Sequence, residues 1–247
     1  MITLPTRRGA LVGPLVVCGI TAEKKVVAEL KKIGVRDSKL LFPKRREELY
    51  GKIKDIVQSK SGVSSIVPIF IQPCKIDESV NQSKRRNGND NGNNGERDNL
   101  NILEAKTMAE IINMIGGNEV YLDALTSRPE RFKRAVAGYL DDERSMNVKI
   151  IAENDADKKY PIVSAASIIA KVERDRVIEE IKKEAGFDFG VGYPHDKRTI
   201  EFVEMLIKTQ KRLPSYVRKS WITTQMLQEK NWQRKIKDFI FRKEKKL

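Results

Sequence analysis

The sequence has few of the residues that build disulfide scaffolds and histidine-based metal sites. Its 247 residues include two cysteines, Cys18 and Cys74, and one histidine, His195. Two cysteines cannot form a disulfide framework or, by themselves, a zinc knuckle, and we expect both to be reduced, buried small hydrophobic residues. A single histidine excludes a zinc site of the H-E-x-x-H type, and we expect His195 to be a loop residue.

Long apolar segments are also missing. No run of 18 apolar residues occurs, so we expect no membrane-spanning helix and no membrane partner. Two arginines precede an apolar segment near the N-terminus, as in an export signal, but Gly13 and Pro14 interrupt that segment and a lysine-rich stretch follows it. We therefore expect a cytoplasmic protein.

Positive charge, by contrast, is in excess. The chain has 48 Lys and Arg residues against 34 Asp and Glu residues, a net charge of +14. From Asp196 to the C-terminus, 15 basic residues stand against 6 acidic ones. Such a surplus attracts polyanions through phosphate contacts and counterion release, so it predicts nucleic-acid binding; a basic surface that only serves solubility is the other interpretation.

Strands and helices alternate along the chain, which predicts an α/β layered fold. Apolar and β-branched runs predict strands at 15–21, 66–71, 119–125 and 148–152. Pro68 predicts that the second strand is an edge strand or contains a bulge. Apolar residues at steps of three and four predict helices at 22–30, 43–57, 101–115, 129–140, 161–184 and 200–209.

One segment, residues 81–98, is rich in Asn and Gly. It cannot bury enough apolar area to offset the entropy of ordering, so we expect a disordered insertion. We predict that it interrupts a first domain, residues 1–190, and that residues 191–247 form a helical substrate-binding region with a basic tail.

A cluster of carboxylates follows one predicted strand, and a single carboxylate lies inside another. Glu153, Asp155 and Asp157 follow the strand 148–152, and Asp123 lies within the strand 119–125, where a lone charge is costly unless it is paired or bound to metal. The pattern is typical of a divalent-metal and phosphate site, with Lys171 on the helix that follows. An ion pair of Asp123 with a buried lysine, and a helix-start position for Asp157, are the alternatives.

Seven blocks of sequence carry a family resemblance. They are GALVGPLVVCG, GVRDSKLLFPKRREEL, NILEAKTMA, VYLDAL, AENDADKKYPIVSAASIIAKVERD, FGVGYPHDKRT and RKSWIT, and they extend from about Arg8 to Thr223. In this order and spacing they resemble type 2 ribonuclease H, the ribonuclease HII family, above all its archaeal branch. The resemblance implies a ribonuclease H-like fold, a mixed central sheet flanked by helices, with a helical C-terminal subdomain.

The resemblance also implies an activity. The family hydrolyses the RNA strand of RNA–DNA hybrids and cuts at single ribonucleotides embedded in duplex DNA, leaving 5′-phosphomonoesters, in DNA replication and repair. Its carboxylates hold two Mg²⁺ or Mn²⁺ ions, of which one activates a water and the other stabilises the leaving 3′-oxygen. We therefore expect an endonuclease with Mg²⁺ or Mn²⁺ as cofactor, acting as a monomer.

The family's roles transfer to five positions of this sequence. Asp123 and Asp157 match its metal-binding aspartates. Tyr193 matches the tyrosine that stacks at the ribose of the ribonucleotide–deoxyribonucleotide junction. Lys39 and Lys171 match basic residues near the phosphates, although a lysine on a helix face is usually exposed to solvent.

The family's opening motif, D-E-A-G-R-G-P, is only partly present. Its Asp and Glu are metal ligands, and its G-R-G backbone contacts the 2′-hydroxyl. Leu4 and Pro5 stand where the two carboxylates belong, whereas Arg8 and Gly9 match the end of the motif. Because neither Leu nor Pro can ligate Mg²⁺, we expect the chain as written to cleave poorly or not at all.

This departure has two interpretations. A mis-called start or a frameshift replaced the true first strand, or the chain is a degenerate homologue. We favour the first, because the rest of the site is intact and loss of activity would not confine the changes to one abrupt stretch. The alternative function is that of a catalytically inactive homologue that binds RNA–DNA hybrids through Arg8, Gly9 and Tyr193.

A last motif lies near the C-terminus. Gln233, Ile236, Phe239 and Ile240 follow the pattern Q-x-x-I-x-x-F-I, close to the peptide by which replication enzymes dock on a sliding clamp. The motif requires two adjacent aromatic residues, and Ile240 occupies the second place. A terminal amphipathic helix that packs on its own domain explains the same spacing.

Overall fold

The structure is a computed structural model that describes most of the chain. The described residues are 8–35, 41–59, 64–86, 100–124 and 126–244, without the side chains of 83–86 and 237–244. All statements below on contacts and elements refer to these residues.

The strands form two pairs of opposite kind. β1 (Leu15–Thr21) runs antiparallel to β2 (Ser65–Ile71), with Leu15 opposite Ile71. β3 (Glu119–Asp123) runs parallel to β4 (Lys149–Glu153), so Asp123 lies opposite Glu153 where both strands end. The combination of antiparallel and parallel pairing confirms the predicted mixed sheet. Within the described residues β2 pairs with β1 alone, which suits an edge strand that contains Pro68.

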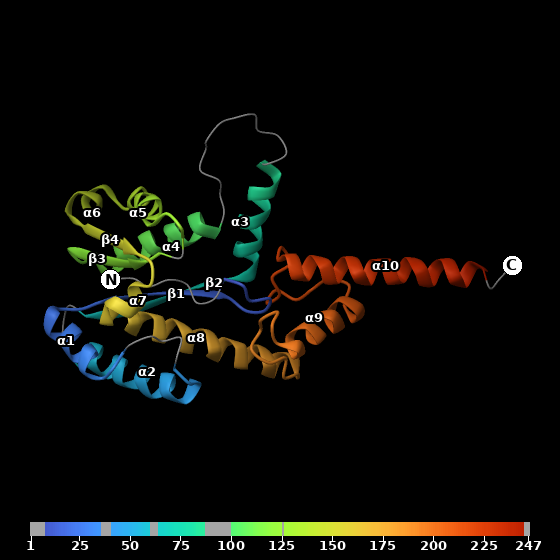
Figure 1. The fold of residues 1–247 in the computed structure, drawn as a ribbon, viewed down its shortest axis with the longest axis horizontal. Helices are drawn as coiled ribbons and strands as arrows, with labels where there is room; N and C mark the ends of the chain where they lie inside the picture. The colour runs from blue at the N-terminus through green and yellow to red at the C-terminus, as the bar shows by residue number, and fades with distance from the viewer. Residues whose placement is uncertain (1–7, 36–40, 60–63, 87–99, 125, 245–247) are drawn as a thin grey trace.

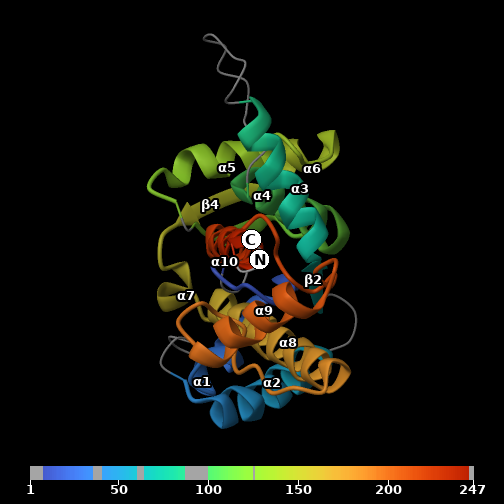
Figure 2. The same cartoon turned by 90° about the vertical axis from the view of Figure 1, so that its right-hand side faces the viewer.

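Helices cover both faces of the strands (Figures 1 and 2). Side chains alternate along β1, so Leu15 and Val17 join one core cluster while Val16, Cys18 and Ile20 join the other. The first cluster is closed by α4 (Leu100–Ile115) and α5 (Pro129–Ala137). The second is closed by α1 (Lys24–Lys32), α2 (Pro43–Gln58) and α8 (Pro161–Ala185).

A third core cluster lies at the C-terminal side. It joins the end of α8 and residues 11 and 12 to α9 (Lys197–Thr209), with Phe189 and Phe202 stacked at 4.8 Å between ring centroids. Beyond it, α10 (Ile222–Glu244) contacts α9 and then extends away from the rest of the molecule (Figure 1). The predicted division at residue 190 stays a prediction, because this cluster includes residues from both sides of it.

The predicted elements match the structure most closely where sequence signals are strong. The strand at 15–21 has the predicted bounds. The helix predicted at 101–115 begins one residue earlier, at Leu100, and is followed by Gly116 and Gly117, both with positive φ. Three helices were not predicted: α3 (Pro73–Arg86), α6 (Asp142–Asn147) and α7 (Ala156–Lys159).

Two expectations need correction or limitation. Residues 81–86 belong to helix α3, although their composition predicts the start of a disordered insertion; residues 87–98 of that segment lie outside the described residues. Cys74 is exposed, so the prediction that both cysteines are buried is wrong for Cys74 and correct for Cys18. In the described parts of the chain, no helix is both long and apolar enough to cross a membrane.

Candidate active site

Asp123 ends β3 as a nearly buried carboxylate, with 4% of the residue exposed. Its Oδ1 accepts a hydrogen bond from the backbone N–H of Ala156, at 3.1 Å. Ala156 is the first residue of α7, so this bond fastens the end of β3 to the short helix that follows β4. A buried carboxylate with a charge-assisted hydrogen bond is held in one orientation.

Asp157 follows Ala156 directly and is also buried, with 2% exposed. The chain reaches it through Asp155, which has φ +56°, a left-handed conformation that Asp adopts more readily than most residues. Because the Asp123 carboxylate bonds the backbone next to Asp157, the structure places the two predicted aspartates on adjoining elements at one end of β3 and β4. Asp157 does lie in a first helical turn, but a helix of only four residues has a small dipole.

The other two carboxylates of the cluster, Glu153 and Asp155, are partly or fully exposed and pair with neighbouring side chains. Asp155 is exposed and pairs with Lys158 at 3.2 Å. Glu153 accepts hydrogen bonds from Lys159 and from the Tyr160 hydroxyl, at 3.1 Å for the latter. The bond from Lys159 is the main reason that the pKa of Glu153 lies below its usual range.

The described donor set falls short of a two-metal site. Two carboxylates with hard oxygen atoms suit Mg²⁺ or Mn²⁺. Within residues that the structure describes, however, no group of three or more His, Cys, Asp and Glu side chains gathers as it would around a metal ion. Leu4 and Pro5 lie outside the described residues, and neither has a ligating side chain. The residues present therefore do not fit a pair of ions.

The turn at Arg8 and Gly9 presents backbone rather than side chain. Gly9 is exposed, and a Cβ added there would meet no atom within 4 Å. The Arg8 guanidinium is held by helix α4: its Nε donates to Glu104 Oε1 at 2.8 Å, Nη1 donates to Asn101 Oδ1 at 2.9 Å, and Nη2 pairs with the second oxygen of Glu104. The open space thus lies over the peptide groups around Gly9.

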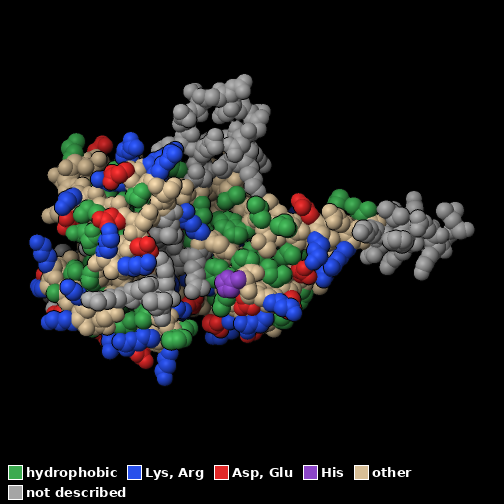
Figure 3. Space-filling view, in the orientation of Figure 1, with side chains coloured by type: hydrophobic (Ala, Val, Ile, Leu, Met, Phe, Trp, Pro, Cys, Tyr) green, Lys and Arg blue, Asp and Glu red, His purple; other side chains and the backbone are tan. Residues whose placement is uncertain are grey.

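Tyr193 lies next to this turn. The backbone N–H of Leu11 donates to the Gly192 carbonyl at 2.8 Å, which joins the loop of Tyr193 to the turn. Tyr193 is 6% exposed; the guanidinium of Arg174 lies 4.7 Å from the centroid of its ring, and the centroid of the His195 ring lies 5.4 Å away. His195 is exposed, as expected of a loop residue, and Figure 3 shows hydrophobic side chains gathered around it.

Two basic residues, Lys171 and Lys39, were predicted to lie near the phosphates. Lys171 lies on α8 and is 8% exposed, so the alternative of an ordinary solvent-exposed lysine is wrong. Burying a long cation is costly unless its charge is compensated, which favours a functional or structural partner. Lys39 lies outside the described residues.

Sequence reasoning missed three buried charges: Glu104, Arg174 and Arg218, each at most 1% exposed. Burial raises the pKa of Glu104 to about 7, although the nearby Arg8 guanidinium acts in the opposite direction. A signal was present for two of them. Glu104 and Arg174 occupy positions where the apolar spacing of their helices calls for hydrophobic residues, four before Met108 and Ile178.

Comparison with known proteins supplies the family. The Ribonuclease HII family model matches residues 7–224, nearly the whole chain and all the site residues above except Leu4 and Pro5. The chain belongs to the ribonuclease HII family. A ribonuclease HII of Methanococcus maripaludis is 40% identical over 224 residues, which cover 89% of this chain and 83% of the relative.

Solved structures agree with the family and the fold. A ribonuclease H2 from Pyrococcus horikoshii superposes with a TM-score of 0.74 at 34% identity, covering 93% of this chain and 98% of the other. A ribonuclease HII from Archaeoglobus fulgidus, solved in complex with PCNA, gives a TM-score of 0.70 at 35% identity, covering 92% and 94%. The family and the fold predicted from the seven sequence blocks are confirmed.

Proposed function

We propose that this ribonuclease HII binds RNA–DNA hybrids, and duplex DNA with one embedded ribonucleotide, as a monomer in the cytoplasm. Members of the family are endoribonucleases that act on such hybrids with divalent metal ions. The observation that supports binding is the open backbone at Gly9, joined to the Tyr193 loop by the Leu11–Gly192 hydrogen bond of 2.8 Å. A glycine with open space at its Cβ position among the described residues lets a ribose approach the backbone closely, and the adjacent tyrosine ring can contact the sugar.

Hydrolysis of the bound strand is the family reaction, for which this chain has an incomplete set of groups. A divalent cation would be held by Asp123 and Asp157, and when bound it would polarise the phosphate and lower the pKa of a water. Lys171 and Lys39 would place positive charge near the phosphates. With Leu4 and Pro5 at the positions of the other two carboxylates, we expect binding to persist and cleavage to be slow.

The experiment compares three duplexes of one sequence: all DNA, DNA with one ribonucleotide, and an RNA–DNA hybrid. Affinity is measured by fluorescence anisotropy and cleavage by gel, with Mg²⁺ and with Mn²⁺. Preference for the two ribose-containing duplexes supports the proposal. Equal affinity for all three would contradict it and would favour a generic DNA-binding protein. Binding without any cleavage would identify the inactive hybrid-binding homologue.

We further propose that α10 docks on a sliding clamp. The A. fulgidus relative was solved in complex with PCNA. In this chain Gln233 and Ile236 are exposed on the part of α10 that extends away from the rest of the molecule, where a partner can reach them (Figure 1). The side chains of Phe239 and Ile240 lie outside the described residues.

The clamp proposal is tested by the double substitution Gln233→Ala and Ile236→Ala, with binding to an archaeal clamp measured by calorimetry. Met226→Ala is the matched control, since Met226 is exposed on the same helix but precedes the motif. The double variant should lose most of its affinity and the control should keep it. Unchanged affinity after deletion of residues 233–247 would contradict the proposal.

A further inference from the structure

Arg218 is a fully buried arginine in the connector between α9 and α10. Its guanidinium donates to three backbone carbonyls of one distant segment: Nη1 to Arg8 at 2.7 Å, Nε to Gly13 at 3.0 Å, and Nη2 to Pro14 at 3.0 Å. Its own backbone N–H donates to the Leu11 carbonyl at 2.9 Å. The connector therefore holds both ends of the segment 8–14.

Only an arginine can make this set of contacts. The guanidinium has five N–H donors in a fixed plane, whereas the ammonium of lysine is a single point. Burial of such a cation is costly, and it is the main reason that the pKa of Arg218 falls to about 10. The carbonyl dipoles offset part of this cost, and the negative charges of Glu104 and Asp77 lie close enough to favour the charged form.

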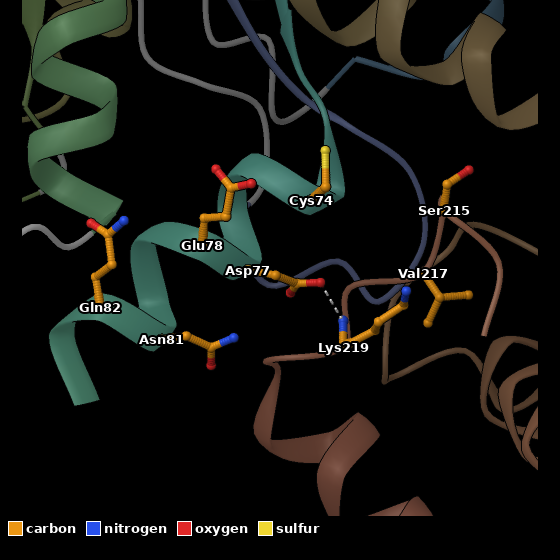
Figure 4. Close-up of a pocket in the computed structure, with 8 residues that line it drawn as sticks. All are labelled: Cys74, Asp77, Glu78, Asn81, Gln82, Ser215, Val217 and Lys219. Atoms are coloured by element: carbon orange, nitrogen blue, oxygen red, sulfur yellow. Dashed lines mark hydrogen bonds between the residues drawn. The ribbon is translucent and has the colours of Figure 1, made fainter. Parts of the chain in front are cut away.

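The connector is itself fixed from a third element. Asp77 on α3 accepts a hydrogen bond from the backbone N–H of Lys219 at 3.0 Å (Figure 4). It also accepts hydrogen bonds from the backbone N–H and the hydroxyl of Ser220, at 2.8 and 2.6 Å. Asp77 and Lys219 line a pocket of about 440 Å³, which none of the predicted site residues lines. Arg218 is thus anchored immediately after its own position in the chain.

The segment that Arg218 holds contains the open backbone at Gly9. Arg8 is fixed twice, since Arg218 binds its carbonyl and Glu104 binds its side chain. From the same segment, Leu11 bonds the Gly192 carbonyl next to Tyr193. Arg174 fixes that second loop by donating to the Val191 carbonyl at 2.8 Å.

We infer that Arg218 is a positioning residue that sets the distance between the Gly9 backbone and the Tyr193 ring, and through it the preference for a ribose over a deoxyribose. The inference rests on the proposed function, because it assigns a cause to the selectivity of that same site. Arg218 is fully buried and does not touch the substrate. It acts by preventing the turn at Gly9 from moving relative to Tyr193.

The test is Arg218→Lys, which keeps the charge but cannot reach three carbonyls. Anisotropy without divalent cations gives the affinity for a duplex with one ribonucleotide and for the same duplex in all DNA. Because two charge-assisted hydrogen bonds to the turn are lost, the ratio of the two affinities should fall about tenfold. Arg212→Lys, an exposed arginine of the same connector, is the matched control and should keep the ratio.

The possible outcomes distinguish a failure of the inference about Arg218 from a failure of the proposed function. If the wild type prefers the ribonucleotide and Arg218→Lys weakens both affinities equally, Arg218 is only structural and the inference is wrong while the proposed function stands. If the wild type has no preference, both are wrong. Should Arg218→Lys fail to fold by circular dichroism, Glu104→Gln replaces it, because it loosens the same turn through Arg8; an unchanged ratio in that variant overturns the inference.

Discussion

The candidate site has two halves: the carboxylates Asp123 and Asp157, and the turn at Gly9 with the neighbouring Tyr193. The two halves differ in how many of their expected groups and supporting contacts are present. At the ends of β3 and β4, the described chain supplies two buried carboxylates, Asp123 and Asp157. Asp123 accepts a hydrogen bond at 3.1 Å from the backbone N–H of Ala156, the residue before Asp157. At the turn of Gly9, by contrast, Arg218 alone makes three hydrogen bonds to the segment. Hydrogen bonds from Arg218 hold the half that would recognise a ribose. The half that would bind metal has two carboxylates, fewer than a two-metal site requires.

The difference suggests a testable separation between recognition and hydrolysis. The turn at Arg8 and Gly9, called the recognition turn below, is held by α4, by the loop after α8 and by the connector before α10. The proposed metal site, by contrast, would take two of its ligands from the positions of Leu4 and Pro5. We therefore propose that a change limited to the residues before Arg8 removes catalysis and leaves binding, and the following predictions test that separation.

The largest expected effect comes from restoring the carboxylates. The double substitution Leu4→Asp and Pro5→Glu should raise the rate of cleavage at an embedded ribonucleotide roughly a thousandfold in Mg²⁺, because complete metal ligation is worth several kcal/mol in the transition state. A gel assay with an end-labelled duplex measures the rate. Adding Asp157→Asn to the restored chain should return cleavage to background. No gain in the double variant would show that positions 4 and 5 are not the missing ligands.

The ion pair beneath the recognition turn is the next test. Glu104→Ala should lower the free energy of unfolding by about 3 kcal/mol, since it leaves the Arg8 guanidinium without its buried partner. Urea unfolding followed by circular dichroism measures the change. Glu119→Ala is the control, because Glu119 pairs with Lys149 at 2.9 Å on the exposed surface and its loss should hardly matter. Equal effects of the two substitutions would contradict the picture of a buried support.

The same carboxyl group should make stability depend on pH. Burial raises the pKa of Glu104 from 4.5 to about 7 in the folded protein. Between pH 4.5 and about 7, the folded state therefore holds a proton that the unfolded state has lost. This group's contribution to stability is complete below pH 4.5 and disappears as the pH rises through about 7. The loss is on the order of 3 kcal/mol. Urea unfolding across this range should show a smaller decline in Glu104→Gln than in the wild type, and parallel declines would refute the assignment.

The smallest effect is expected at the tyrosine of the recognition half. Tyr193→Ala should reduce the preference for a ribonucleotide-containing duplex about tenfold, because an aromatic stack contributes about 1–3 kcal/mol per base. Tyr193→Phe keeps the ring and its contacts with Arg174 and His195, and it should retain the preference within about twofold. Anisotropy with matched duplexes measures both. Loss of preference in the Phe variant as well would show that the hydroxyl, rather than the ring, is needed.

The sequence was sufficient for elements whose periodicity and end signals agree. The strand at 15–21 and the helix at 100–115 have both apolar periodicity and clear boundary residues. The helix α3 was missed because its polar residues outnumber its apolar ones, and it is stabilised by burial of Ile76 and by the contacts of Asp77 with the connector. Such support comes from distant residues and leaves no local pattern.

The candidate site shows the same limit. Asp123, Asp157 and Tyr193 were predicted from motifs, but their supports, Glu104, Arg174 and Arg218, were not. Arg218 bonds residues 204 to 210 positions away in the sequence, a pairing that no spacing rule indicates. The three backbone carbonyls that it binds account for the burial of its charge.

The central claim, that recognition persists without efficient hydrolysis, is tested most directly on the unmodified chain. One measurement suffices: the affinity for a duplex with a single ribonucleotide and its cleavage rate in the same Mg²⁺ buffer, beside the Asp157→Asn variant. We predict preferential binding over the all-DNA duplex and a cleavage rate no higher than that of the variant. Rapid cleavage at the ribonucleotide that Asp157→Asn abolishes would contradict the account.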